Sequence, residues 1–544
     1  MSAGSNGAAA RSPSGTELDE AVRAAVAGVD RHFAERARDH HAPSASYGVF
    51  TRSGLVHTGS TGEVAGRAPT PDTIYRIASC TKSFTATALL ALRDTGTLTL
   101  DDPITEYVPA FADDVLPTRD SPVPTLRMLL TMSAGFPTDD PWGDRQESLT
   151  DAGLDALLRR GLRFDSVPGT RFAYSNLGYA LLGRVVTMAS GKPYREVVEQ
   201  SILAPLGLTS TTFTAPADAS DRLAVGHRPV GDEWEPLPFS GPGAFSSIGG
   251  LFSTVTDLSR WARWLASAWS DDEAGAGDAR PGTPAQAGGD LDGDLDGILS
   301  RSSRRELQQI ARFVPALASQ PTGYGFGLFA EQQPGLGPVV SHSGGYPGFS
   351  AHMRWHRATG VGIVAFENAT YAQVAVAAST SLHALLHEIG AGPAVAVWPE
   401  VVAARARVEG LLAAAVDGSG VPDGLDDSAL FSENVALDIP WSRRLVAWRE
   451  AFSTVGAAAP AGQGAESARQ GAEWRPAPAA VSSSPDAAPG DLPIDPAAGE
   501  ESLAPSHLVW RLPGSRGRVR VELRLTPEAT PRIQTLTVRA EPSA

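Results

Sequence analysis

The sequence predicts an α+β protein in which helices flank an antiparallel sheet. Apolar residues recur at helical spacing from residue 18 to residue 33, and two short runs of strand-forming residues, 46–51 and 55–58, follow with a turn between them. A second apolar helical pattern begins just after Lys82. A helix, a hairpin and another helix in this order are typical of an antiparallel sheet covered by helices. Residues 96–251 read mostly as helices and loops, which predicts a mainly helical subdomain.

The chain is long enough for two or more domains, because it has 544 residues and 42% of them are hydrophobic. We expect a disordered N-terminus over residues 1–15, a main domain over 16–395 and a C-terminal accessory domain over 396–544. The main domain contains an acidic, glycine-rich insertion at 270–300. The accessory domain contains a tract rich in Ala, Pro, Gly and Ser at 456–506, which predicts disorder or a long loop.

The accessory domain reads as a small α+β or β-rich appendage. Residues 399–416 have a helical pattern, and residues 434–439 are interpreted as a strand. Residues 507–512, 518–525 and 532–539 also read as strands. From residue 518 to residue 525, charged and aliphatic side chains alternate, which is typical of a strand with one face in water.

Composition excludes several classes of function. The formal net charge is −16 without a compensating basic cluster, so we expect neither nucleic acid nor an anionic membrane as a partner. No apolar run is long enough to span a membrane, and the first fifteen residues lack the hydrophobic core of a secretory signal, which predicts a cytoplasmic protein. Cys80 is the only cysteine, so no intramolecular disulfide is possible. No pattern specifies an oligomeric state.

Ser79 and Lys82 form the first candidate catalytic pair. They lie three residues apart at the start of a predicted helix, which places the hydroxyl and the amine on one face within reach of each other. A lysine whose pKa is lowered by burial can take the proton of a serine and so activate it as a nucleophile. A capping serine with a solvated lysine would give the same pattern, so the pair needs support from elsewhere in the chain.

Two further groups supply that support. Tyr174 and Asn176 precede a helical run; the phenol can move a proton, and the amide can orient a substrate while holding the lysine amine. His342, Ser343 and two glycines lie between a predicted strand at residues 324–328 and two more at 350–354 and 362–366. Glycine at a strand edge lets a substrate backbone approach closely. The backbone N–H groups at this strand end are candidates to complete an oxyanion hole with the N–H of Ser79.

The three groups together resemble the serine β-lactamase-like superfamily. Ser79-Cys80-Thr81-Lys82, Tyr174-Ser175-Asn176 and His342-Ser343-Gly344 have the order and rough spacing of its motifs, and the flanking residues are similar to the class C-like branch, which includes D-alanyl-D-alanine carboxypeptidases, D-aminopeptidases and β-lactamase-fold esterases. The resemblance covers residues 17–386 and implies a β-lactamase/transpeptidase-like fold. It implies that Ser79 is the acylated nucleophile and that Lys82 and Tyr174 share acid–base work. It further implies substrate binding by Asn176, His342, Ser343 and Gly344, and an oxyanion hole formed by the backbone N–H groups of Ser79 and Gly345.

His342 departs from many β-lactamases, which have a lysine at the first position of the third motif. A neutral imidazole binds a carboxylate more weakly than an ammonium group does, so we expect poor hydrolysis of penicillin-type acids. The sequence therefore predicts a serine hydrolase that cleaves a small ester, amide or short peptide, of the carboxylesterase or D-amino-acid peptidase type. A β-lactamase, or a catalytically silent penicillin-recognising sensor of the same fold, is the alternative. No cofactor is expected, and no metal, because His352 and His356 read as sheet residues without further ligands.

Overall fold

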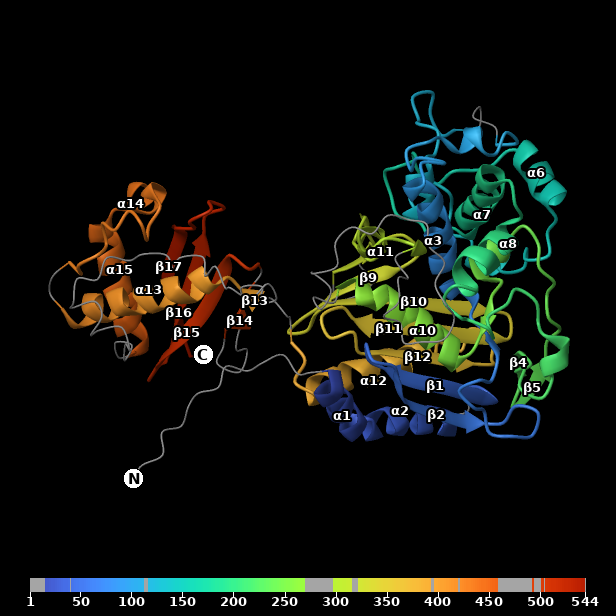
Figure 1. Cartoon of the computed structure of the whole chain (residues 1–544), viewed down its shortest axis with the longest axis horizontal. Coiled ribbons are helices and arrows are strands. Elements are labelled where there is room, and N and C mark those ends of the chain that lie inside the picture. Colours follow the sequence, from blue (N-terminus) through green and yellow to red (C-terminus); the bar gives the residue numbers. More distant parts are fainter. Residues whose placement is uncertain are drawn as a thin grey trace, which may run out of the picture. The chain divides into compact units, whose positions relative to one another are not determined.

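The computed structural model describes residues 15–39, 41–111, 116–269, 297–315, 321–392, 396–418, 421–457, 492–493, 500–502 and 504–543. The chain divides into two compact units, Pro13–Pro393 and a smaller one that contains Ala394–Ala544, and each is described by itself (Figure 1). The predicted disordered N-terminus, apart from Gly15, lies outside the described residues. So do residues 270–296 of the predicted insertion and most of the predicted tract at 456–506.

The larger unit is built on an eight-stranded antiparallel sheet, which confirms the predicted α+β class. Within the sheet, β10 pairs with β11 so that Ser343 lies opposite His352 and Gly345 lies opposite Ser350. The strands, in sheet order, are β2 (Leu55–Gly62), β1 (Ser44–Phe50), β12 (Gly362–Glu367), β11 (Phe349–His356), β10 (Gly337–Tyr346), β9 (Phe329–Gln333), β8 (Thr322–Tyr324) and β7 (Arg312–Phe313).

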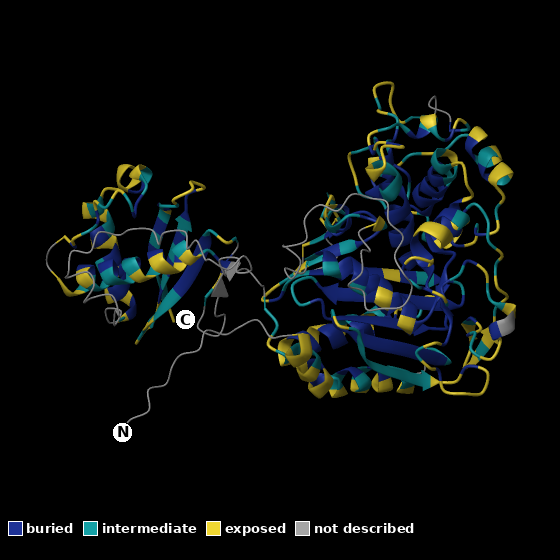
Figure 2. Ribbon diagram, viewed as in Figure 1, coloured by how far each residue is buried: buried dark blue, intermediate teal, exposed yellow. Residues whose placement is uncertain are grey.

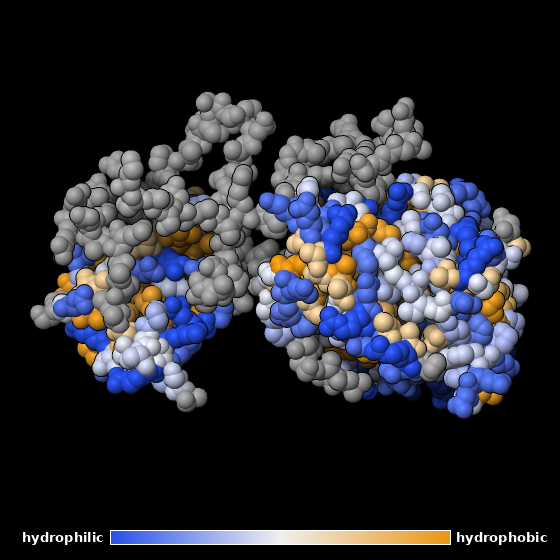
Figure 3. Space-filling view, turned by 90° about the horizontal axis from the view of Figure 1, so that it is seen from below, coloured by the Kyte–Doolittle hydropathy of each residue, from blue (hydrophilic) through white to orange (hydrophobic). Residues whose placement is uncertain are grey.

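Three helices cover one face of this sheet: α1 (Gly15–Ala25), α2 (Ala27–Arg38) and α12 (Ala375–Glu388) (Figure 1). The sequence predicts one helix through residues 18–33, whereas the structure has two, separated at Val26. Val22, Val29 and Phe33 still point inward and are buried with apolar residues of β1 and β12. Seen from the side of α1 and α2, the surface mixes hydrophilic and hydrophobic residues, as expected for amphipathic helices with one face in water (Figure 3).

The opposite face carries α10 (Val255–Ala266) and the helical subdomain. At the centre of the subdomain lies α3 (Thr81–Asp94), whose first ten residues are all buried (Figure 2). The Phe84 ring stacks on the Trp261 ring of α10 with centroids 3.8 Å apart, which ties α3 to the sheet-covering helix. The other helices of the subdomain are α4 (Leu126–Leu130), α5 (Asp140–Gly143), α6 (Asp151–Arg159), α7 (Asn176–Ser190), α8 (Tyr194–Val198), α9 (Ser246–Gly249) and α11 (Arg301–Leu307).

Side-chain caps explain where several helices begin. Thr125, Thr150, Ser175, Thr254 and Ser300 each accept a hydrogen bond from a backbone N–H of the first turn of the following helix. Short strands complete the unit: β3 (Tyr75–Arg76) pairs with β6 (Phe252–Ser253), and β4 (His227–Val230) pairs with β5 (Glu233–Pro236). The β3–β6 pair places the residues before Ser79 against the loop before α10.

One predicted strand, residues 324–328, is a turn in the structure. Only Tyr324 belongs to β8, and the chain turns at Phe326 and Gly327 before β9 begins. Gly327 has φ +71, and a Cβ atom there would lie 2.6 Å from the backbone oxygen of Lys82. The close approach of this turn to α3 therefore needs glycine.

The smaller unit packs helices on a three-stranded antiparallel sheet of β15 (His507–Gly514), β16 (Gly517–Leu525) and β17 (Ile533–Pro542), which confirms the three strands read from the sequence. The helices are α13 (Pro399–Asp417), α14 (Glu433–Asp438) and α15 (Trp441–Val455), and β13 (Ala396–Val397) pairs with β14 (Leu492–Pro493). The strand predicted at 434–439 is wrong: it is the helix α14, too short for apolar periodicity to separate the two states. Glu501 pairs with Val509 of β15, so the end of the predicted disordered tract is part of the fold.

Neither membrane spans nor metal clusters are found in the part of the chain that the structure describes. Each described helix is too short or too polar to cross a lipid bilayer. In the same ranges, no three His, Cys, Asp or Glu side chains are arranged to hold a metal ion.

Candidate active site

Ser79 lies in a single 3-10 turn, Ala78–Cys80, between β3 and α3. The residue before it, Ala78, has φ +45, a conformation that costs energy for any residue with a side chain. The backbone N–H of Ile77 donates to the oxygen of Leu251 at 2.9 Å, which fixes the approach to this turn. The turn and the helix that follows place the Ser79 side chain, which is 6% exposed, at the base of a cavity.

Lys82 is completely buried one turn further along and contacts Ser79 directly. Its Nζ lies 2.9 Å from Ser79 Oγ, 2.7 Å from Asn176 Oδ1 and 2.9 Å from the backbone oxygen of Ile248. Two of these three partners can only accept hydrogen bonds, whereas the serine hydroxyl can also donate. An ammonium group would donate to all three oxygens, whereas a neutral amine can donate to Asn176 and Ile248 and accept the Ser79 proton.

Burial brings this neutral form within reach near neutral pH. Burial lowers the pKa of Lys82 to about 8, although the carboxyl groups of Asp140, Asp144 and Asp139 oppose the shift. Near neutral pH the amine thus gives up its proton far more readily than a solvated lysine does. Cys80, beside the pair, is fully buried, and burial raises the pKa of its thiol to about 12, so it remains a neutral packing residue.

Tyr174 and Asn176 flank the pair at the start of α7. Lys82 Nζ lies 5.0 Å from the centre of the Tyr174 ring. Burial and the nearby Asp140 raise the pKa of Tyr174 well above its ordinary value, against a hydrogen bond with Ser79 that lowers it. The phenol is therefore protonated at neutral pH and suited to donate a proton rather than to remove one.

Asn176 is fixed at both ends of its amide by other residues. Its Oδ1 accepts from Lys82, and its Nδ2 donates to Asp140 Oδ1 at 3.0 Å. Asp139 accepts from the backbone N–H groups of Asn176 and Leu177 and so holds the start of α7. Asn176 holds the Lys82 amine, as the sequence predicts, and it is not among the residues that line the cavity; binding of substrate by Asn176 stays a prediction.

The third motif lies at the end of β10. The neighbouring strand β9 pairs with β10 only as far as Ser341. Beyond Ser341, this edge of β10 has no strand partner among the described residues. Gly345 and Ser343 line the cavity at this edge. Gly344 faces the other way: a Cβ atom there would lie 2.3 Å from the backbone oxygen of Ile77, so it permits β10 to lie against the segment that carries Ser79.

His342 is neutral and held at both ring nitrogens. Its Nδ1 donates to the backbone oxygen of Ser343 at 2.6 Å, so its Nε2, 3.2 Å from the Tyr324 hydroxyl, is the acceptor. Burial and the charge of Lys82 lower the pKa of His342 to about 3. The ring lines the cavity with its face, and neither nitrogen is left to bind a substrate carboxylate.

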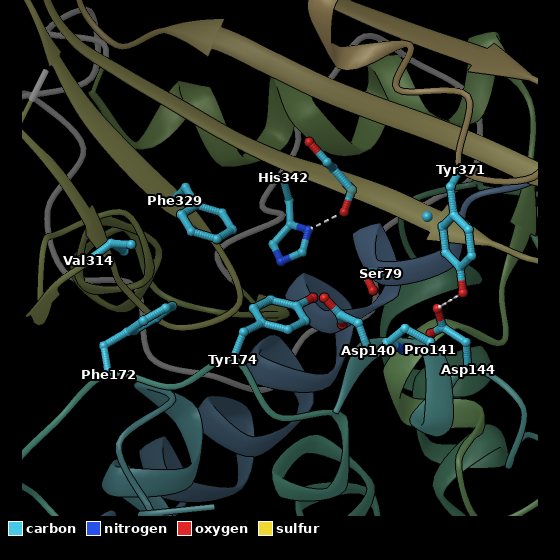
Figure 4. A pocket seen from close by; sticks show the side chains of 12 residues that line it. Ser79, Asp140, Pro141, Asp144, Phe172, Tyr174, Val314, Phe329, His342 and Tyr371 are labelled. Carbon is cyan, nitrogen blue, oxygen red and sulfur yellow. Dashed lines mark hydrogen bonds between the residues drawn. The ribbon is translucent and has the colours of Figure 1, made fainter. Parts of the chain in front are cut away.

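These residues surround a cavity of about 540 Å³ (Figure 4). More than half of its wall was not predicted from the sequence, because residues such as Asp140, Asp144 and Tyr371 lie in segments without a distinctive pattern. The wall is formed by Ser79, Asp140, Pro141, Asp144, Phe172, Tyr174, Val314, Phe329, His342, Ser343, Gly345 and Tyr371.

Several known proteins have sequences related to this chain. The E. coli (strain K12) D-alanyl-D-alanine-carboxypeptidase/endopeptidase AmpH is 34% identical over 206 residues, which is 36% of this chain and 49% of that protein, so the chain matches about half the length of this relative. Penicillin-binding protein 4 of Amycolatopsis lactamdurans is 29% identical over 340 residues, 59% of this chain and 80% of that protein.

A solved structure is similar in fold. The octameric penicillin-binding protein homologue from Pyrococcus abyssi aligns with a TM-score of 0.56 at 19% identity and covers 94% of this chain and 99% of that chain. The family model described as Beta-lactamase matches residues 29–387, which include all three motifs. This match extends over most of the chain, and the resemblance read from the motifs is confirmed: the chain belongs to the beta-lactamase family of serine hydrolases.

Proposed function

We propose that the protein is a serine hydrolase that cleaves an ester or an amide through an acyl-enzyme on Ser79. The observation that carries this proposal is the set of three contacts of Lys82, which suits a neutral amine that accepts the Ser79 proton. A buried lysine with a lowered pKa is one of the few bases able to activate serine without a histidine.

In the first step the Ser79 proton moves to Lys82 as Oγ attacks the substrate carbonyl carbon. The negative charge that develops on the carbonyl oxygen is stabilised by the backbone N–H groups of Ser79 and Gly345, both on the cavity wall. The protonated Tyr174 donates to the leaving group as its bond to carbon breaks, and Lys82 returns a proton to Tyr174. Water then hydrolyses the acyl-enzyme by the same route in reverse.

The other site residues act indirectly in this proposal. Asn176 orients Lys82, and Gly344 lets β10 approach the Ser79 turn. His342 forms part of the substrate wall with its ring face, and Ser343 forms part of it beside Gly345. We propose residues 16–395 as the catalytic domain and residues 396–544 as an accessory domain without a catalytic role.

The wall of the cavity argues against penicillin-type acids as the main substrates. Its described residues include two carboxyl groups and no lysine or arginine, and His342 is neutral. The test is turnover of short-chain p-nitrophenyl esters, amino-acid amides and a chromogenic cephalosporin by the wild type and by Ser79→Ala. We expect turnover of an ester or amide that Ser79→Ala lacks; turnover by the variant at the wild-type rate would contradict the proposal.

A further inference from the structure

The cavity has two chemically different ends, with Ser79 and His342 between them (Figure 4). At one end lie the apolar side chains of Phe172, Val314 and Phe329. At the other end lie the Asp144 carboxyl group and the Tyr371 hydroxyl, and the Asp140 carboxyl group lies nearer the middle, below Ser79 in this view (Figure 4). A substrate that fills the cavity thus meets aromatic rings on one side of the nucleophile and acidic groups on the other.

The Asp144 carboxyl group is buried and has few partners that would stabilise its negative charge. The residue is 3% exposed, and the Tyr371 hydroxyl, which donates to Oδ2 at 2.9 Å, is its single hydrogen-bond donor in the described parts of the chain. Asp140 accepts from Asn176, and neither carboxyl group forms an ion pair with a described lysine, arginine or histidine. Burial raises the pKa of Asp144 to about 7, as expected for a carboxyl group that lacks a close cation.

The two cationic side chains that act on Asp144, Lys82 and Arg76, do not supply the missing close cation. Lys82 lies close enough to affect both carboxyl groups, but it must be neutral to accept the Ser79 proton. Arg76 influences Asp144 from a distance and is itself paired with the buried Glu147. When Lys82 is neutral and the Asp144 carboxyl group is ionised, the negative charge of that group has no close cation, and a cationic group of the substrate would balance it.

Tyr371 sets the position of the acidic end relative to the oxyanion hole. Its backbone has φ +50, and its ring lies against Gly345, because a Cβ atom on Gly345 would be 2.8 Å from the ring. The hydroxyl of the same ring holds Asp144. The Tyr371 side chain therefore links Gly345, a proposed oxyanion-hole residue, to the Asp144 carboxyl group.

We propose that the substrate is an aminoacyl compound, whose free α-ammonium group binds between Asp140 and Asp144 and whose apolar portion lies against Phe172, Val314 and Phe329. Tyr371 acts as a positioning residue that orients Asp144. This inference rests on the proposed acyl-enzyme function and narrows it to amides or esters of amino acids and peptides with a free amino terminus. Charge-assisted hydrogen bonds of an ammonium group to buried carboxylates are among the stronger polar contacts, which makes them effective in selecting a substrate.

The test compares substrates that differ only in the amino group. We would measure kcat/KM at about pH 7, where an α-amino group is largely protonated, for the p-nitroanilides of D-phenylalanine, L-phenylalanine and 3-phenylpropanoic acid. The wild type should prefer at least one phenylalanine enantiomer over the 3-phenylpropanoyl compound by about 10-fold or more. Asp144→Asn and Asp140→Asn keep the shape and the acceptor oxygen, and each should reduce that preference by about 10-fold.

Tyr371→Phe keeps the ring against Gly345 and should reduce the preference by a smaller factor. Asp120→Asn, which removes the same charge from an exposed loop, should leave the preference unchanged. Thermal melting identifies any variant that does not fold. The two aspartates are replaced in separate variants, so either variant can test the proposal if the other does not fold. If the wild type hydrolyses both phenylalanine anilides with a kcat/KM equal to or lower than that of the 3-phenylpropanoyl anilide, the aminoacyl assignment is wrong. The acyl-enzyme proposal would still stand. A preference for the phenylalanine anilides that survives in both folded aspartate variants would also overturn the aminoacyl assignment. Failure of the wild type to hydrolyse any anilide or ester would instead contradict the proposed function.

Discussion

Lys82 Nζ lies 2.9 Å from Ser79 Oγ, and both side chains are buried at the start of α3. The other two neighbours of this amine, Asn176 Oδ1 and the Ile248 backbone oxygen, are acceptors that hold it in place. The serine therefore has its base already positioned before substrate arrives. Prior positioning of this kind removes much of the entropic cost of bringing a base and a nucleophile together.

Lys82→Arg should abolish turnover while preserving the positive charge. Arginine stays protonated in proteins, so it cannot accept the Ser79 proton, and we expect kcat to fall by about 10³-fold or more. The measurement is kcat for the best ester or amide of the panel, with thermal melting as the control for folding. A folded variant that retained kcat within about twofold would mean that Lys82 is not the base.

The activity should rise with pH through the titration of Lys82. Because burial lowers the pKa of this amine to about 8, its proton-accepting form is the minor one at neutral pH and the major one above that value. We expect kcat/KM to increase and then level off above an apparent pKa near 8. Asp144 titrates in an adjoining range, so the profile of Asp144→Asn serves as the control: the rise should persist but move to lower pH, because the Asp144 charge that raises the pKa of Lys82 is removed.

Tyr174→Phe should affect amides more than activated esters. An amine leaving group needs a proton as it departs, whereas p-nitrophenolate is a stable anion that leaves without one. We expect kcat/KM for an amide to fall by about 10²-fold or more, within the usual range for loss of a general acid, and the value for a p-nitrophenyl ester of the same acyl group to fall much less. Equal losses for the two substrates would argue that Tyr174 shapes the cavity and donates no proton to the leaving group.

The buried ion pair of Arg76 and Glu147 should be important for stability. The two side chains are 1% and 2% exposed, and Arg76 belongs to β3, which leads into the Ser79 turn. Glu147→Ala leaves the guanidinium group buried without its partner, so we expect a loss of about 3–5 kcal/mol in the free energy of unfolding. Glu106→Ala, at an exposed position, should change it by less than about 0.5 kcal/mol in the same denaturation experiment.

Much of the fold was predictable because its elements obey simple periodicities. The strands β1, β2 and β15 to β17 and the helices α3 and α13 all follow apolar patterns along the sequence. The failures occur where a local pattern is short or interrupted, as in α14 and in the turn between β8 and β9. There, packing against distant residues decides the structure, and the approach of Gly327 to Lys82 is invisible in a local sequence window.

The site was predictable to the extent that it consists of motifs. The motifs indicated the contacts of Lys82 with Ser79 and Asn176, and the structure adds the Ile248 backbone oxygen as the third partner of the amine. The roles expected for Asn176 and His342 at the substrate depend on which hydrogen bonds their side chains already make, and only three-dimensional coordinates reveal those. The acidic wall could not be predicted, since Asp144 and Tyr371 lie 227 residues apart and meet only in the folded chain.

The central claim is that Ser79 becomes covalently acylated, and the most direct test is intact-protein mass spectrometry after reaction with a serine-directed p-nitrophenyl phosphonate. This reagent forms a stable adduct with an activated serine, and peptide mapping locates it. We expect one adduct per chain, carried by Ser79, and no adduct in Ser79→Ala. We also expect labelling of Lys82→Arg at least about 10²-fold more slowly, because the base is lost. An adduct on another residue, or undiminished labelling of Ser79→Ala, would contradict the central claim.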